Sequence, residues 1–531
     1  MESSPLASGR PLRYAVYLIL ITTAVASMLG RTMSVKSDRG KTPFLCANDR
    51  SRWATVRALG DLGHYSLDPV IFSRPGKRDP EWYTIDLVRH RGKDGREHYY
   101  SSKPPLFPTM LAAQYWLIKR VTGATLVERP FFVGRLMLVI TNIVPLILYF
   151  VVLTWLLERS DTSDWVRLFT LSAAAWGTFL TTFAVTLNNH LPAAISVTFT
   201  LLAAYQVFFR GDSRGHWYAL AGFASAFAAA NELPALSFFC LCAVGFAARS
   251  LRQTVVWFIP SAGLVAVAFF ATSYLAHGTL RPAYAHRKDG PAVVSIPLPA
   301  GQTAAAAQSS PDWLDDLRTA GARLSPRAVI RPSARPQRWV VWDPEVDVRW
   351  ALACEGDALV MRTWDNWYEY EGSYWLPSQV RGVDRGEPSR WVYAFHVLIG
   401  HRGVFSLTPL WLLSLAGMLI WLRVDDRRLR VFAGAVLLLT VVSLAFYLLR
   451  PLSDRNYGGV ACGFRWVFWC TPLWLCTMLP AVEVMRYSRA GRLAAWFCLA
   501  WSTFSASYSC LDPWSHPWIF DLWTSWGWLH Y

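Results

Sequence analysis

An aspartate and a lysine in the polar segment after the first apolar run have side chains suited to proton transfer and phosphate binding. Asp49 lies shortly after the apolar residues 14–30. A carboxylate at a membrane surface is partly withdrawn from water, which raises its basicity and suits a general base. Lys103 precedes two prolines, which stiffen the backbone and present the ammonium group near the depth of lipid phosphates. Both residues also fit plainer roles, as a solvated loop aspartate and a lysine that snorkels to the interface.

A second group of polar residues lies at the ends of later apolar runs, on the side that we predict to face away from the cytoplasm. Arg135 opens the second apolar run, and arginines are uncommon on that side. Arg465 follows the glycine-containing turn 456–464, and its guanidinium can bind a phosphate through two hydrogen bonds. Both arginines also fit an interface role. Further candidates for binding a polar substrate, or for capping helices, are Asn189, His190 and Glu232.

The composition indicates a membrane protein. Of the 531 residues, 53% are hydrophobic and only 17% are charged, and the charged residues gather between long apolar runs. This pattern is typical of helical proteins that cross a membrane many times. The net charge of +16 comes mostly from short loops beside apolar runs, so we expect no nucleic-acid partner. The histidines show no spacing that predicts a metal site, and we expect no cofactor, although the sequence is compatible with a divalent cation.

The apolar runs predict an all-α bundle of about eleven transmembrane helices, with the N-terminus in the cytoplasm and two large outer loops. The run 106–118 is too short to cross a bilayer and is predicted to lie at the interface. With that run left out, the arginine-rich turns fall on the cytoplasmic side at nearly every crossing, whereas counting it inverts the pattern. The predicted spans are 14–30, 136–157, 166–187, 191–209, 217–230, 233–248, 255–276, 404–422, 431–449, 467–484 and 493–508.

We divide the chain into five regions. The first holds two spans and an outer loop with interfacial helices, and the second and fourth are transmembrane bundles. The third is an outer loop whose first half is of low complexity and predicted to be irregular, while its second half, 339–375, is predicted to form a small folded cap. The fifth carries five tryptophans and is predicted to lie along the outer interface. The regions are 1–157, 158–276, 277–403, 404–510 and 511–531.

Three motifs, taken in order, resemble the first outer loop of the GT-C glycosyltransferases, most nearly the bacterial protein-mannosyltransferase and aminoarabinose-transferase-like group. The late element Gly463-Phe464-Arg465-Trp466 is similar to an arginine element of the same family. The resemblance covers the N-terminal third of the chain and the general layout of the spans. The three motifs are Asp49-Arg50-Ser51-Arg52-Trp53-Ala54, Lys103-Pro104-Pro105-Leu106 and Gly134-Arg135-Leu136.

This resemblance implies an enzyme of the bacterial inner membrane whose active site faces the periplasm or exterior. It would move a sugar from a polyprenyl-phosphate carrier to a hydroxyl of a lipid, polysaccharide or protein acceptor. Asp49 would be the catalytic carboxylate and would deprotonate the acceptor, giving inversion. Lys103, Arg135 and Arg465 would lie near the carrier phosphate, and Arg52 would contribute to substrate binding.

The sequence also departs from the family pattern. Arg50 stands where the family has a second acid, and the third region is unusually large. Asn188-Asn189-His190 stands where the family has an acidic residue in the next outer turn. The alternative is a non-catalytic protein, such as a transporter, a lipid flippase or a component of envelope polysaccharide assembly. A transporter usually places ionisable groups within its spans, and here the spans are almost free of charge.

Overall fold

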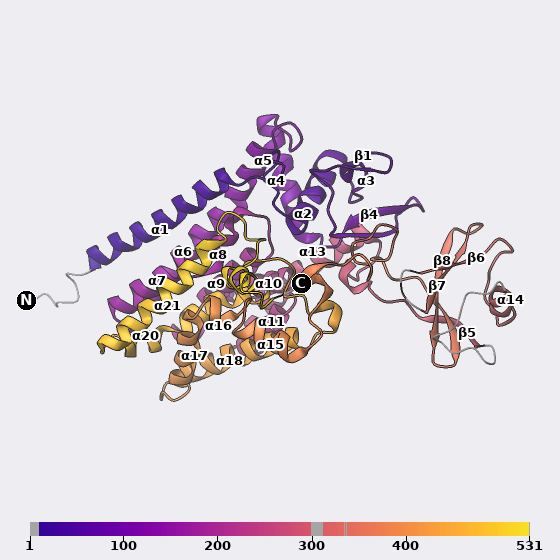
Figure 1. Cartoon of the computed structure of the whole chain (residues 1–531). Coiled ribbons are helices and arrows are strands. Elements are labelled where there is room, and N and C mark those ends of the chain that lie inside the picture. Colours follow the sequence, from indigo (N-terminus) through magenta and orange to yellow (C-terminus); the bar gives the residue numbers. More distant parts are fainter. Residues whose placement is uncertain (1–9, 299–311, 334, 336, 530–531) are drawn as a thin grey trace, which may run out of the picture.

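The computed structural model describes residues 10–298, 312–333, 335 and 337–529, and most of them belong to one helical bundle (Figure 1). The long helices form because apolar residues with good helix propensity run without interruption between polar turns. The main helices are α1 (Arg10–Ser34), α5 (Pro130–Leu138), α6 (Val144–Glu158), α7 (Asp164–Trp176), α9 (His190–Ala204), α10 (Gly215–Asn231), α11 (Ala235–Arg249), α13 (Ile259–His277), α17 (Leu410–Trp421), α18 (Arg427–Leu448) and α21 (Arg489–Tyr508).

Six of the described helices are long and apolar enough to cross a membrane, and a seventh is reached if one bent pair counts as a span. This is fewer than the eleven spans predicted. Three of the other predicted spans correspond to helices that are shorter than these six. Helix α10 has 17 residues, α11 has 15 and α17 has 12. The six are Arg10–Ser34, Pro130–Glu158, Asp164–Val185, His190–Phe209, Leu251–His277 and Arg427–Leu448.

The polar turns gather at two opposite ends of the bundle. At one end, Arg13 near the start of α1 bonds through Nε to Glu158 at the end of α6 (2.7 Å) and through Nη1 to Asp164 at the start of α7 (2.6 Å). Ser163 at the same end donates to Glu483 (2.8 Å). The other end holds the turns that follow α1, α7, α10 and α18.

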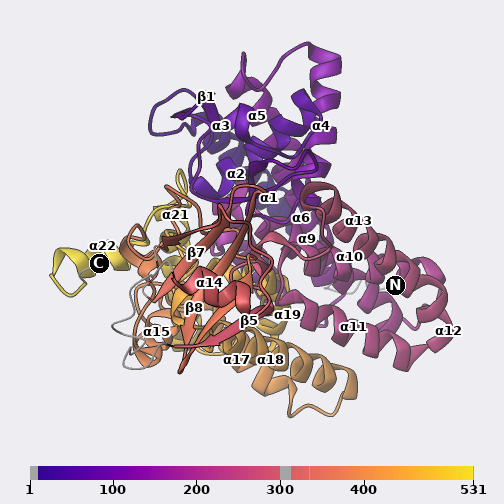
Figure 2. The ribbon, with the colours of Figure 1, turned by 90° about the vertical axis from the view of Figure 1, so that its right-hand side faces the viewer.

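Residues 35–129 form a layer over the second end of the bundle, visible in indigo to purple at the top of Figure 2. Helix α2 (Ala47–Arg57) packs on α4 (Leu106–Thr122), which begins after Pro105 and is the short helix predicted at 106–118. The layer also contains strands, which the sequence did not predict. They are β1 (Phe72–Arg74) with β2 (Lys77–Arg78), and β3 (Leu87–Arg91) with β4 (Glu97–Ser101); α3 (Asp68–Ile71) precedes β1.

The third region contains a five-stranded antiparallel sheet that projects away from the bundle, at the right of Figure 1. Inward residues alternate along β7, where Trp339 and Val341 face α14 (Asp312–Thr319), as expected for a half-buried strand. The predicted folded cap is thus part of a sheet that begins before residue 339. The first half of the loop, predicted to be irregular, contains two of the strands and α14, and residues 299–311 lie outside the described ones. In sheet order the strands are β5 (Ala292–Pro297), β9 (Ala358–Thr363), β8 (Val348–Glu355), β7 (Arg338–Asp343) and β6 (Val329–Pro332).

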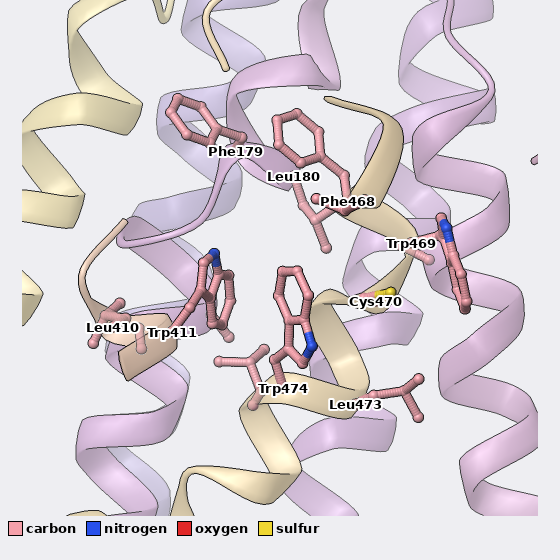
Figure 3. Packing of buried hydrophobic residues seen from close by; sticks show 14 of the residues in the cluster. Phe179, Leu180, Leu410, Trp411, Phe468, Trp469, Cys470, Leu473 and Trp474 are labelled. Carbon is pink, nitrogen blue, oxygen red and sulfur yellow. The ribbon is translucent and has the colours of Figure 1, made fainter. Parts of the chain in front are cut away.

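The predicted span 467–484 is a broken helix rather than a straight one. A 3-10 turn, η9 (Arg465–Cys470), leads into α19 (Thr471–Thr477), and α20 (Leu479–Met485) continues after a bend of 47°. A proline follows each break, and proline cannot continue the hydrogen-bonding of a helix interior. Phe468 of η9 stacks on Phe179 with ring centroids 5.3 Å apart, which fixes the segment that carries Arg465 (Figure 3).

The remaining helices complete the bundle and the chain end. They are α8 (Phe179–Thr182), α12 (Leu251–Gln253), α15 (Arg390–Leu398), α16 (Val404–Leu407) and α22 (Trp518–Ser525).

Candidate functional site

A cavity of about 1080 Å³ opens where the outer layer, the bundle and the third region meet. Its polar wall comes from α2, from the residues before α4, from the turn 456–466 and from the segment 364–387. Its apolar wall comes from the outer parts of α10 and α11, from α13 and from the end of α18. The apolar wall includes Ala226, Ala229, Ala230, Leu233, Leu236, Phe239, Ile259, Ala262, Val265, Ala266, Phe269, Phe270 and Phe446.

Three cations of the polar wall lie close enough to repel one another: Arg52, Lys103 and Arg465. Arg52 lies one turn after Asn48 on α2, so its Nη1 reaches the Asn48 carbonyl (2.9 Å), while its Nη2 donates to Asn189 (2.7 Å). Burial, together with repulsion from Arg465, lowers the pKa of Arg52 to about 10. Within the described part of the chain, neither Arg52 nor Arg465 forms an ion pair with a carboxylate. This end of the cavity therefore favours an anion.

Arg465 is fixed by the turn that precedes it. Its Nε and Nη2 both donate to the carbonyl of Gly458, at 3.0 and 2.7 Å. Gly458 has φ +84°, and a Cβ there would lie 3.1 Å from the Arg465 Nε, so both conformation and space favour glycine. Trp514 lies under the guanidinium, 5.1 Å from its carbon to the ring centre, which adds a cation–π contact.

His190 and Glu232 continue a chain of hydrogen bonds that begins at Arg465, on the side of Arg465 that does not line the cavity. Arg465 donates from Nη1 to Nε2 of His190 (3.0 Å), which places the imidazole proton on Nδ1, and Nδ1 donates to Glu232. Asn189 also donates to Glu232 (2.7 Å). Burial raises the pKa of Glu232 to about 8, although Arg465 and Arg52 act in the opposite direction. Neither Glu232 nor His190 lines the cavity, so both orient other residues.

Lys103 lines the cavity, as the sequence predicts for a phosphate-binding residue, and is paired with Asp86. Its Nζ lies 2.9 Å from Oδ2 of Asp86. Burial lowers the pKa of Lys103, and the neighbouring arginines add to this effect. The sequence interpretation missed Asp86, which lies just before β3. An acid directly before the buried residues Leu87 and Val88 was the available signal.

Asp49 does not line the cavity, although the sequence predicted it as the catalytic base. Its side chain is fully buried and accepts hydrogen bonds from the backbone N–H groups of Leu45 (3.0 Å) and Cys46 (2.9 Å) and from the Thr186 hydroxyl (2.8 Å). Together with Cys46 it forms a capping box at the start of α2. Burial raises the pKa of Asp49, and these three hydrogen bonds oppose that rise. In this arrangement Asp49 fixes α2 and hence Arg52.

We expect Asp49→Ala to destabilise the protein by about 2 kcal/mol, because three donors lose their acceptor and α2 loses its cap. Thermal unfolding of the solubilised protein measures this loss. Asp357→Ala, at the exposed turn between β8 and β9, is the matched control and should unfold as the wild type does. An Asp49→Asn protein of normal stability that has lost all activity would contradict a structural role.

Arg135 is also separate from the cavity. Its Nη2 donates to the Val35 carbonyl (3.0 Å), and its guanidinium lies over the Phe131 ring at 4.5 Å. The hydrogen bond to Val35 joins the last turn of α5 to the segment that follows α1. The structure therefore brings together Arg52, Lys103, Asn189 and Arg465 from the predicted set, and it leaves Arg135 outside.

Other cavity residues come from regions of the chain that carry no local sequence signal for a site. Trp514 belongs to the tail predicted to lie along the interface, but it is buried and donates from Nε1 to Thr186 (3.0 Å). The third region contributes Arg287 and Asp384. Asp454, which also lines the cavity, is held by Arg450 (2.5 Å) and lies 3.6 Å from Arg287. Such long-range contacts cannot be inferred from spacing along one chain.

Among the residues that the structure describes, no group of three or more histidine, cysteine, aspartate or glutamate side chains is placed to hold a metal ion.

No protein family matches this chain in a comparison with known families, and no curated protein matches it.

Proposed function

We propose that the protein is an integral membrane glycosyltransferase with about eleven spans in a GT-C-like arrangement. It transfers a sugar from a polyprenyl-phosphate carrier to an acceptor hydroxyl on the non-cytoplasmic face of a bacterial inner membrane, with inversion at the anomeric carbon. The acceptor is a lipid, a polysaccharide or a protein.

The observation that carries this proposal is a single cavity with two chemically different parts. One part holds the buried guanidinium groups of Arg52 and Arg465 beside Lys103, and neither guanidinium forms an ion pair with a carboxylate of the described residues. The other part is apolar and follows α13 from Phe270 to Ile259, which is about 16 Å of helix at 1.5 Å per residue. An amphiphile with a phosphate head and a hydrocarbon tail matches both parts at once, because charge binds to the cations and the tail to the apolar wall.

The cations would act on the leaving group. As the bond between the anomeric carbon and the phosphate oxygen breaks, negative charge grows on the phosphate. Arg465, Arg52 and Lys103 stabilise that charge in a site of low dielectric, where a fixed cation has more effect than in water. The contacts to Gly458, Asn189 and Asp86 hold the three side chains in place before the reaction begins. These cations could stabilise the leaving group without a metal ion.

The test uses membranes that contain the wild-type protein or Lys103→Ala, a panel of labelled polyprenyl-phosphate sugars, and a crude envelope extract as acceptor. We expect the wild type to consume one donor and Lys103→Ala to consume it at least about 100-fold more slowly, because one of the cations that stabilise the leaving phosphate is lost. Equal rates would reject the phosphate role of Lys103. A wild-type protein that binds the carrier but never releases its sugar would favour a lipid flippase.

A further inference from the structure

The geometry points to Asp384 as the general base that deprotonates the acceptor hydroxyl, an inference that rests on the proposed glycosyl transfer. Asp384 lies on η7 (Gly382–Arg385), a short 3-10 turn of the third region, and it lines the cavity. Neither the sequence motifs nor the family resemblance points to this residue.

Three carboxylates line the described part of the cavity, and they differ in their partners. Asp86 is paired with Lys103, and Asp454 is held by Arg450. Asp384 instead accepts hydrogen bonds from two neutral groups, the Tyr374 hydroxyl (3.0 Å) and the Asn456 amide (3.1 Å). A carboxylate in an ion pair is a weak base because its charge is already neutralised, whereas Asp384 keeps its basicity.

The surroundings of Asp384 support this assignment. Burial raises its pKa, and the negative charge of Asp86 adds to the rise, while hydrogen bonds from Tyr374 and Asn456 and the charge of Arg465 act in the opposite direction. Burial also raises the pKa of Tyr374 to about 12, so its hydroxyl stays protonated and donates at neutral pH. A partly buried, oriented carboxylate of raised pKa is suited to removing a proton near neutral pH.

Asp384 also has a fixed position relative to the phosphate-binding end. The turn 456–459 lies between them: Asn456 donates to Asp384, and the Gly458 carbonyl accepts from Arg465. On the other side, Gly386 has φ +81° and lies so close to the Leu452 carbonyl that a Cβ would be only 2.1 Å from its oxygen. The segment that carries Asp384 is therefore packed against the bundle rather than free in the outer loop.

In the proposed transfer, Asp384 takes the proton of the acceptor and the phosphate takes the electron pair of the broken bond. The acceptor oxygen attacks the anomeric carbon and forms the new glycosidic bond, and its proton passes to a carboxylate oxygen of Asp384. The bond from the anomeric carbon to the phosphate oxygen breaks, and its electron pair leaves with the phosphate beside Arg465. Because attack and departure occur on opposite faces, the configuration inverts.

The experiment compares single-turnover transfer with carrier binding in the purified, full-length protein. The variants are Asp384→Asn, Asp384→Glu and the exposed control Asp357→Asn. We expect Asp384→Asn to lower transfer about 100- to 10,000-fold while the affinity for a polyprenyl phosphate without sugar stays within a few-fold of wild type. Asp384→Glu, which keeps a carboxylate, should recover part of the rate, and Asp357→Asn should behave as wild type.

The pH profile separates a base from a structural residue. Transfer by the wild type should fall as the pH drops through the pKa of Asp384, because a protonated base cannot accept a proton. Tyr374→Phe removes a hydrogen bond to the ionised form, so this fall should move to higher pH. In Asp384→Asn the fall should be absent from the residual rate.

Three outcomes would overturn the inference. One is wild-type transfer by Asp384→Asn, above all if Asp86→Asn loses transfer instead. The second is a parallel loss of transfer and carrier binding in Asp384→Asn, which would indicate a structural residue. The third is a wild-type protein that binds the carrier and transfers nothing, which would reject the glycosyltransferase proposal itself and the base with it.

Discussion

Replacing Arg465 by alanine is expected to lower the rate of sugar transfer by about two to three orders of magnitude, the largest effect among the cations of the cavity. The guanidinium supplies charge to the leaving phosphate, and its loss also leaves His190 and the Gly458 carbonyl without their donor. Single-turnover release of labelled sugar from the carrier measures the effect.

Two further arginine substitutions sharpen this prediction. Arg465→Lys keeps the charge but cannot bond Gly458 and His190 together, so we expect it to recover only a small part of the rate. Arg96→Ala, in the exposed turn between β3 and β4, should leave transfer unchanged. A fully active Arg465→Ala protein would show that the carrier phosphate binds elsewhere.

Blocking the apolar wall is the second large effect that we expect. Ala266 of α13 lines the cavity, and its side chain is accessible, so Ala266→Trp can fill the space without disturbing the helix core. We expect transfer from a long-chain polyprenyl-phosphate donor to fall at least about 30-fold, because the hydrocarbon tail loses its place against α13 and its burial free energy. Binding of the labelled carrier in detergent or nanodiscs measures the loss of affinity that should cause this fall in transfer.

The neighbouring residue gives a matched control. Val267 lies on the same helix, is 68% exposed and does not line the cavity, so Val267→Trp should bind the carrier as the wild type does. A carrier with only a few isoprene units should be less sensitive to Ala266→Trp than the long one. Equal loss for both tryptophan variants would mean that the substitution harms the helix and that the tail lies elsewhere.

The sequence predicted a helical bundle with membrane-spanning helices, because long apolar runs leave the backbone few alternatives in a membrane, but only six or seven of the eleven predicted spans correspond to helices of spanning length. The short helix predicted at 106–118 is α4, which extends to Thr122. The sequence did not predict the five-stranded sheet, because β5 is separated from its partner β9 by about sixty residues of chain. The residues of β7 do not alternate strictly between apolar and polar types, so its inward face becomes apparent only once its partner strands are known.

The candidate site was predicted in part. Lys103 precedes two prolines, which restrict the backbone, and Arg465 follows a turn with glycines, which allow positive φ; both effects are local and can be read from the chain. Asp49 shows the limit of that approach: an acid after a span can cap a helix or act as a base, and only its contacts with Leu45 and Thr186 distinguish the two. Asp384 had no local signal, because its role depends on a turn 72 residues later in the chain.

The buried guanidiniums of Arg52 and Arg465, which pair with no carboxylate among the residues that the structure describes, have a consequence for the stability of the protein before any substrate binds. Withdrawing a cation from water is costly, and a bound anion offsets that cost only in the folded state. By mass action, an anionic lipid that occupies the cavity makes unfolding harder in proportion to the logarithm of its concentration. If an anionic lipid occupies the cavity in this way, we expect a preparation stripped of lipid to unfold more easily than one that retains it.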